Sequence, residues 1–126
     1  MTAYISGHLD LTVDEFKDHY VPLIDKALQE GHEFVVGDAR GADALAQQYI
    51  SENCATPIEY APVRVYHMFT KPRNNVGFKV VGGFSSDEER DATMTAVSDY
   101  DIAWVRPGKE NSGTAKNILR RKQEKL

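Results

Sequence analysis

Small residues that would let a backbone bind an anion are concentrated in residues 37–43, directly after an unbroken apolar run. The run, Phe34–Val36, is typical of a short strand that is buried on both faces. Gly37, Gly41 and the alanines near them keep bulky side chains away, so backbone N–H groups could approach a ligand closely. A strand that leads through such a turn into a helix brings unpaired N–H groups and the positive end of the helix dipole together, which favours phosphate binding.

From spacing alone, two interpretations of this segment are open. In the first, Gly37, Gly41 and Ala42 form the anion site, and Arg40 adds a fixed positive charge. In the second, the segment is only a tight connection and Arg40 is solvated. Apolar residues at helical spacing from Ala42 onward predict a helix in both cases.

Strand and helix patterns alternate along the whole chain. Strands are predicted near residues 3–6, 34–36, 63–68 and 101–106, and helical patterns lie between them. This alternation predicts a single α/β domain of the Rossmann-like type, with a mainly parallel sheet of about four to five strands and helices on both faces. Residues 78–84 fit either an edge strand or a flap over the site.

Three further loops of small or polar residues follow the predicted strands. They contain Ser6 with Gly7, Arg73 with Asn74, and the run Ser112–Thr114. In parallel sheets, ligands bind beyond the carboxyl ends of the strands. We therefore expect these loops to meet the turn at residues 37–43 at one rim and to form the site of a phosphate-bearing ligand.

Local signals mark several helix boundaries. Thr12 and Glu15 have the spacing of a capping box, and Ser86 with Glu89 forms a second one. Pro22, inside a helical pattern, predicts a kink or two helices that meet there. Ser112 can cap the last helix, whose residues from Arg120 onward are expected in solvent, and Trp104 is expected in the core as part of a strand.

Composition excludes several classes of protein. A chain of 126 residues has room for one domain, and its net charge of −4 argues against a general binder of nucleic acid or anionic membranes. No apolar run approaches the roughly 20 residues of a membrane helix, and no secretory signal is expected. With Cys54 as the one cysteine, a cytoplasmic protein without disulfides is expected. His19 and His32 have no partner cysteine or acidic cluster at metal-ligand spacing, so no metal is expected. No cofactor is expected either.

Three of these motifs together resemble the Rossmann-like SLOG superfamily, close to its YpsA/YspA-related branch. The segment 37–46, GDARGADALA, is similar to the signature G-G-A-R-G-A-D-x-L-A, Arg73-Asn74 resembles an R-N pair of that branch, and Ser112–Thr114 resembles the G-G-T or S-G-T element before its last helix. The resemblance covers essentially the whole chain. It implies a nucleotide or nucleotide-derived ligand, whose phosphate would be held by residues 37–42 and whose charge Arg40 and Arg73 would neutralise.

Two departures from the family pattern bear on catalysis. Asp38 stands where the family often has a second glycine. Asn117 stands where the phosphoribohydrolase branch, with its P-G-G-x-G-T-x-x-E motif, has a catalytic glutamate, and an amide cannot act as a general acid or base. If a carboxylate assists glycosidic cleavage, Asp43 is the first candidate and Asp38 the second. Asp43 could equally do no more than stabilise the start of its helix.

Three functions stay open at this point. The leading hypothesis is a binder or sensor of a nucleotide. The second is a hydrolase or deoxyribosyltransferase that acts on the N-glycosidic bond of a nucleoside monophosphate. The third is a protein-interaction module with a vestigial pocket. Analogy with small SLOG-like domains suggests a homo-oligomer, although no feature of the sequence requires one.

Overall fold

The computed structural model describes residues 1–124, and its centre is a five-stranded sheet in which every neighbouring pair of strands is parallel. The order across the sheet is β4-β3-β2-β1-β5. The strands are β1 (Thr2–Ile5), β2 (Glu33–Gly37), β3 (Val63–Met68), β4 (Lys79–Phe84) and β5 (Tyr100–Ile102). The predicted α/β class with a parallel sheet is therefore confirmed, and within the segment 78–84 the edge strand is Lys79–Phe84.

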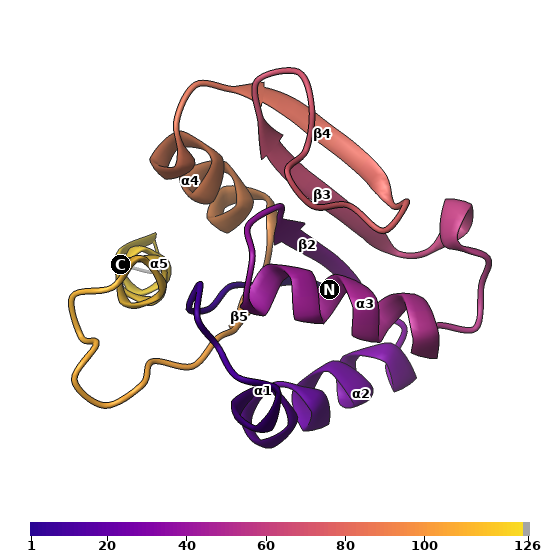
Figure 1. Cartoon of the computed structure of the whole chain (residues 1–126), viewed down its shortest axis with the longest axis horizontal. Helices are drawn as coiled ribbons and strands as arrows, with labels where there is room; N and C mark the ends of the chain where they lie inside the picture. The colour runs from indigo at the N-terminus through magenta and orange to yellow at the C-terminus, as the bar shows by residue number, and fades with distance from the viewer. Residues whose placement is uncertain (125–126) are drawn as a thin grey trace.

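Helices cover both faces of the sheet, as Figure 1 shows. One face carries α1 (Val13–His19), α2 (Val21–Gln29) and α3 (Ala42–Asn53), and the other carries α4 (Asp87–Val97) and α5 (Gly113–Glu124). A short 3-10 helix, η1 (Ile58–Tyr60), leads into β3. Among the described residues, no helix is both long enough and apolar enough to cross a membrane.

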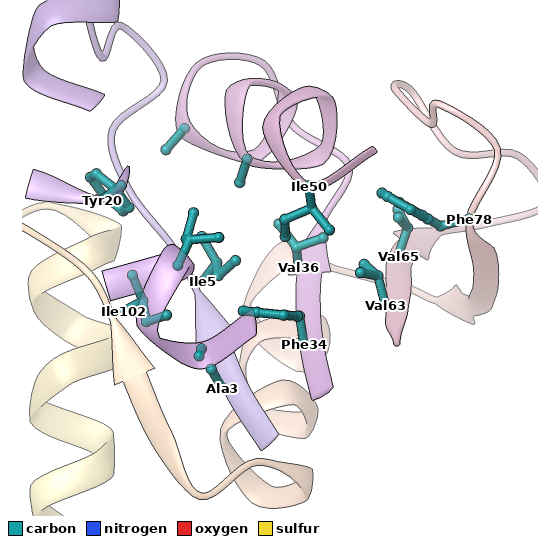
Figure 2. Packing of buried hydrophobic residues seen from close by; sticks show 14 of the residues in the cluster. Ala3, Ile5, Tyr20, Phe34, Val36, Ile50, Val63, Val65, Phe78 and Ile102 are labelled. Carbon is teal, nitrogen blue, oxygen red and sulfur yellow. The ribbon is translucent and has the colours of Figure 1, made fainter. Parts of the chain in front are cut away.

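Alternate residues of the strands build two separate cores. The larger core lies under α1, α2 and α3 and receives Ala3, Ile5, Phe34, Val36, Val63, Val65 and Ile102 from the sheet (Figure 2). The smaller core lies on the opposite face, where Tyr4, Val35 and Tyr66 pack against Met94 of α4. Because both faces of β2 are buried, its run Phe34–Val36 is apolar without interruption.

The capping signals are largely confirmed. Thr12 accepts a hydrogen bond from the Glu15 N–H at 3.1 Å, and the Glu15 carboxylate accepts one from the Thr12 N–H at 3.0 Å, so the first capping box is complete. Ser86 caps α4 through the Glu89 N–H at 3.1 Å, but the Glu89 carboxylate bonds to the preceding Ser85 instead, so the second box is only half formed.

At Pro22 the structure has two helices, α1 and α2, which meet at Tyr20. The Pro22 ring lies within the first turn of α2, where a missing N–H costs no intrahelical hydrogen bond. This outcome is one of the two alternatives that the sequence predicted.

Two expectations near the C-terminus were wrong. Strand β5 ends at Ile102, so Trp104 is not part of a strand, although it is half-buried and packs against the larger core as expected. Its ring is stacked on His19 at a centroid distance of 4.0 Å. Arg121 is not solvated but buried, and its Nη1 donates to the backbone oxygens of Thr95 at 3.0 Å and Ser98 at 2.7 Å. In each case a donor bonds to residues that are distant in the sequence, the Trp104 N–H to the Tyr20 hydroxyl and the Arg121 guanidinium to Thr95 and Ser98. Residues 125–126 of the expected solvated tail lie outside the described part of the chain.

Candidate functional site

A cleft of about 590 Å³ opens beyond the carboxyl ends of β1 and β5. Strand β2 lies on one side of β1 and β5 on the other, so the chain reverses its direction of winding at β1. Ligands of open parallel sheets bind at such a reversal, because the loops on either side turn away from each other and leave a crevice. The cleft is bounded by the loop after β1, the start of α3, the first turns of α4, and the loop between β5 and α5.

The cleft brings together seven of the thirteen residues predicted for the site. They are Ser6, Gly7, Asp43, Arg73, Ser112, Gly113 and Thr114. The other six lie within two positions of a cleft-lining residue in the sequence but do not line the cleft themselves. These are Gly37, Asp38, Arg40, Gly41, Ala42 and Asn74, of which Arg40 is exposed at the surface.

The β2–α3 turn is closed off by the loop that follows β1. Its Ala42 N–H donates to the backbone oxygen of His8 at 3.1 Å. Gly41 has a φ of 74°, and a Cβ at this position would collide with the backbone oxygens of His8 and Leu9. These glycine and alanine positions therefore let two loops pack closely, and the cleft is lined at this end by Ala39 and Asp43.

Asp38 is fully buried in an ion-pair network outside the cleft. Its carboxylate accepts from the Arg73 N–H at 2.7 Å, from Arg73 Nη2 at 2.8 Å and from Arg90 Nη1 at 2.7 Å. Burial alone would raise the pKa of Asp38, but the hydrogen bonds from Arg73 and the charges of both arginines hold it below its usual value. In this arrangement the carboxylate fixes the loop that carries Arg73 and Asn74.

Gln47 holds the same loop from α3 and was not identified from the sequence. Its Nε2 donates to the backbone oxygens of Gly37 at 3.0 Å and Asn74 at 3.1 Å, and its Oε1 accepts from the Val76 N–H at 3.1 Å. Asn74 adds a bond from its own Nδ2 to the Asp38 backbone oxygen at 3.0 Å. The Arg73-Asn74 pair is therefore positioned by side chains of the β2–α3 unit.

Asp43 differs from Asp38 in that it lines the cleft. It is buried, and burial raises its pKa to about 7, against the opposing effects of the Arg90 charge and of the Ala39 N–H, which donates to Oδ2 at 3.2 Å. A carboxyl group with a pKa near 7 can both take up and release a proton at neutral pH. Of the two predicted catalytic candidates, Asp43 alone has access to a ligand in this cleft.

Several cleft residues were not assigned a site role from the sequence, among them Tyr4, Arg90, Asp91 and Asn117. Tyr4 is a β-former inside a strand, and Arg90 and Asp91 lie in a helix that begins with acidic residues, so none of them differs from an ordinary core or surface residue in the sequence alone. Arg90 is buried beneath the cleft and also donates to Asp91 Oδ1, from Nε at 3.2 Å and from Nη2 at 3.0 Å.

The opposite wall of the cleft is suited to an anion. The Ser112 Oγ caps α5 by accepting from the Ala115 N–H at 3.2 Å, which leaves the N–H groups of Gly113 and Thr114 at the first turn without an intrahelical acceptor. Lys109 lies on the rim. Ser6 faces the same cleft, and its Oγ is buried without a hydrogen-bond partner in the described part of the protein.

Arg106 ties the β5–α5 loop to the other side of the site. Its N–H donates to His8 Nε2 at 2.9 Å, and its guanidinium contacts Glu15 Oε1 at 2.7 Å and Asp10 Oδ1 at 3.1 Å. The hydrogen bond with Arg106 is the main cause that lowers the pKa of Glu15 to about 2. The two loops that face each other across the cleft are thus joined by one side chain.

No known protein was found to be similar to this chain. Protein-family models, curated proteins and solved structures gave no match to the chain. Within residues 1–124, no three His, Cys, Asp or Glu side chains are grouped as a metal site would require.

Proposed function

We propose that the cleft binds a nucleotide or a nucleotide-derived ligand whose phosphate lies at the start of α5. The observation that carries this proposal is the Ser6 hydroxyl, which is buried without a partner among residues 1–124 in a cleft that also receives the first turn of α5. An unpaired buried hydroxyl costs about 1–3 kcal/mol, and a bound oxygen atom would remove that cost.

Charge favours the start of α5 over the arginines as the phosphate subsite. Arg73 and Arg90 are already paired with Asp38, Asp87 and Asp91. Around the first turn of α5, by contrast, the backbone N–H groups, the Thr114 hydroxyl and Lys109 are all donors. A helix N-terminus with such donors is a well-suited anion site. We therefore expect the phosphate at the glycine-containing turn Ser112–Thr114 and not at the turn of residues 37–42.

Two further features support a nucleotide over a smaller anion. The cleft volume of about 590 Å³ lies in the range of small-molecule sites, which is roughly 300–1,000 Å³. The resemblance of three motifs to the SLOG superfamily also implies a nucleotide or a derivative of one. A phosphate ion alone would leave most of this cleft filled with water.

The experiment is a thermal-shift screen of nucleoside 5′-monophosphates and their deoxy forms, followed by calorimetric titration. At least one nucleotide should raise the melting temperature, and Lys109→Ala should weaken its binding about tenfold because a charged hydrogen bond is lost. Lys116→Ala removes the same charge from an exposed position on α5 that does not line the cleft, so its affinity should match the wild type. If no nucleotide shifts the melting temperature, the protein-interaction module with a vestigial pocket becomes the better account.

Asp43 favours a second candidate function, cleavage or transfer at the N-glycosidic bond of a nucleoside monophosphate. Its ionised carboxylate could stabilise the oxocarbenium-like centre of that reaction, and the pKa of about 7 would make turnover rise as the pH increases through neutrality. Incubation with nucleoside monophosphates should then release free base, and Asp43→Asn should abolish release while the nucleotide still binds. Binding without release in the wild type would favour the sensor.

A further inference from the structure

The side-chain amide of Asn117 has a fixed orientation. Its Oδ1 accepts from Arg120 Nη1 at 2.6 Å, and its Nδ2 donates to the Tyr4 hydroxyl at 3.1 Å. A guanidinium has only donors, so the oxygen of the amide must face Arg120 and the NH₂ group must face Tyr4. The Tyr4 oxygen is therefore the acceptor in this pair.

This orientation determines where the Tyr4 proton can go. Because Asn117 approaches the oxygen with a donor, the phenolic O–H has to turn away from Asn117. Burial, together with the neighbouring carboxylates of Asp91 and Asp43, raises the pKa of Tyr4 well above its usual value, so the hydroxyl keeps its proton at neutral pH. Tyr4 lines the cleft together with Asp91, and a hydrogen bond from its hydroxyl to the Asp91 carboxylate is one of the causes of the raised pKa. A ligand oxygen would therefore replace Asp91 as the acceptor of the Tyr4 proton.

The position of this donor relative to the start of α5 is set by the helix itself. Asn117 follows Thr114 by three residues, and both line the cleft. Side chains three residues apart on a helix lie about 5–6 Å from each other, which is roughly one sugar ring. A ligand with its phosphate at Thr114 would thus bring its sugar next to the Tyr4 hydroxyl.

We propose that Tyr4 is a specificity-determining residue that donates a hydrogen bond to the sugar of a 5′-phosphorylated ligand, and that Asn117 is the residue that positions it. The inference rests on the proposed nucleotide site and adds the basis on which a sugar phosphate is distinguished from free phosphate. It also gives Asn117 a role that an acidic side chain could not perform, since a carboxylate has no proton to donate to Tyr4.

The experiment compares affinities for ribose 5-phosphate, nucleoside monophosphates and inorganic phosphate. Tyr4→Phe should weaken binding of the two sugar phosphates about tenfold and leave that of inorganic phosphate unchanged, since one hydrogen bond is lost at the sugar alone. The matched control is Tyr66→Phe, which removes the same hydroxyl from the same apolar cluster but outside the cleft. This variant should leave the affinities for the sugar phosphates and for inorganic phosphate unchanged.

Asn117→Asp tests the positioning role without changing the size of the side chain. The Tyr4 proton would then turn toward position 117, so the ratio of sugar-phosphate affinity to inorganic-phosphate affinity should fall, even though the added charge weakens both. If the wild type binds sugar phosphates and Tyr4→Phe binds them equally well, this inference is wrong and the nucleotide site stands. If the wild type binds none of these ligands, both proposals fail together. Circular dichroism and melting temperatures establish that each variant is folded.

Discussion

The Asp38 carboxylate accepts three hydrogen bonds from Arg73, from the backbone N–H at 2.7 Å, from Nε at 3.2 Å and from Nη2 at 2.8 Å. This pair fastens the loop before β4 to the turn after β2, across 35 positions of sequence. Arg90 reaches the same carboxylate from α4. A single buried acid therefore joins three segments that border the cleft.

Removal of this acid should strongly destabilise the fold. Asp38→Asn keeps the shape of the side chain but leaves Arg90, which is buried, without its full complement of negative charge. Loss of one partner from a buried ion pair costs about 3–5 kcal/mol. Urea denaturation measures this cost. Asp18→Asn, at an exposed position of α1, should stay within about 0.5 kcal/mol of the wild type.

Asp43 should make stability depend on pH in the opposite sense to an ordinary carboxylate. Its pKa is raised from 3.8 to about 7, so between these values the folded protein keeps a proton that the unfolded chain has lost. The free energy of unfolding should therefore fall as the pH rises from about 4 to about 7. Asp43→Asn should remove this fall and be more stable than the wild type at pH 8, by up to about 4 kcal/mol. Equal pH profiles for the two proteins would contradict the raised pKa.

Gly41 should be far less tolerant of substitution than a glycine of the same conformation elsewhere. Gly41 and Gly31 both have a φ of 74°, but a Cβ at Gly41 would collide with backbone oxygens, whereas a Cβ at Gly31 would meet no atom within 4 Å. Gly31→Ala should cost about 1 kcal/mol from the backbone conformation alone. Gly41→Ala should cost at least about 2 kcal/mol more, because the loop after β1 must move. The comparison of the two melting temperatures isolates the close approach.

Two buried serines should respond oppositely to alanine. The Ser6 Oγ has no partner in the described structure, so Ser6→Ala should leave the ligand-free protein as stable as the wild type or raise its stability by about 1 kcal/mol. Ser98 donates to the Met94 backbone oxygen at 2.6 Å and accepts from Arg121, so Ser98→Ala should cost about 2 kcal/mol. Nucleotide affinity should fall about tenfold in Ser6→Ala and stay unchanged in Ser98→Ala. A destabilised Ser6→Ala variant would mean that the hydroxyl has a structural partner after all.

The fold class was predictable because the relevant signals are local. Apolar runs such as Phe34–Val36, the Thr12 cap and the spacing of the helices each depend on neighbouring residues. The end of β5 was not predictable, because the residues after Ile102 bond to residues that are distant in the sequence instead of to the neighbouring strand. The Trp104 N–H donates to the Tyr20 hydroxyl at 3.1 Å, and the Arg106 N–H to His8.

The site was predictable to the extent that parallel strands bring their following loops to one edge. Ser6, Asp43 and Ser112 meet for this reason. Which acids face the cleft could not be derived, because that depends on pairing across long separations. The Asp38 carboxylate accepts a hydrogen bond from Arg90, which lies 52 positions further along the sequence. No pattern in the sequence marks Arg90 as buried.

The central position of β1 has a consequence for the order of events in folding. The first strand of the chain pairs with the last one, Ala3 with Tyr100, and the α5 wall of the cleft lies later still. During synthesis, β1 can pair with β2 early, but its other edge stays open until β5 has emerged. Pairing of β1 with β5 joins segments that are far apart in the sequence and is therefore slow. The cleft can form only after both β5 and α5 have been synthesised. A fragment that ends before β5 would expose the edge of β1 that pairs with β5 in the finished protein.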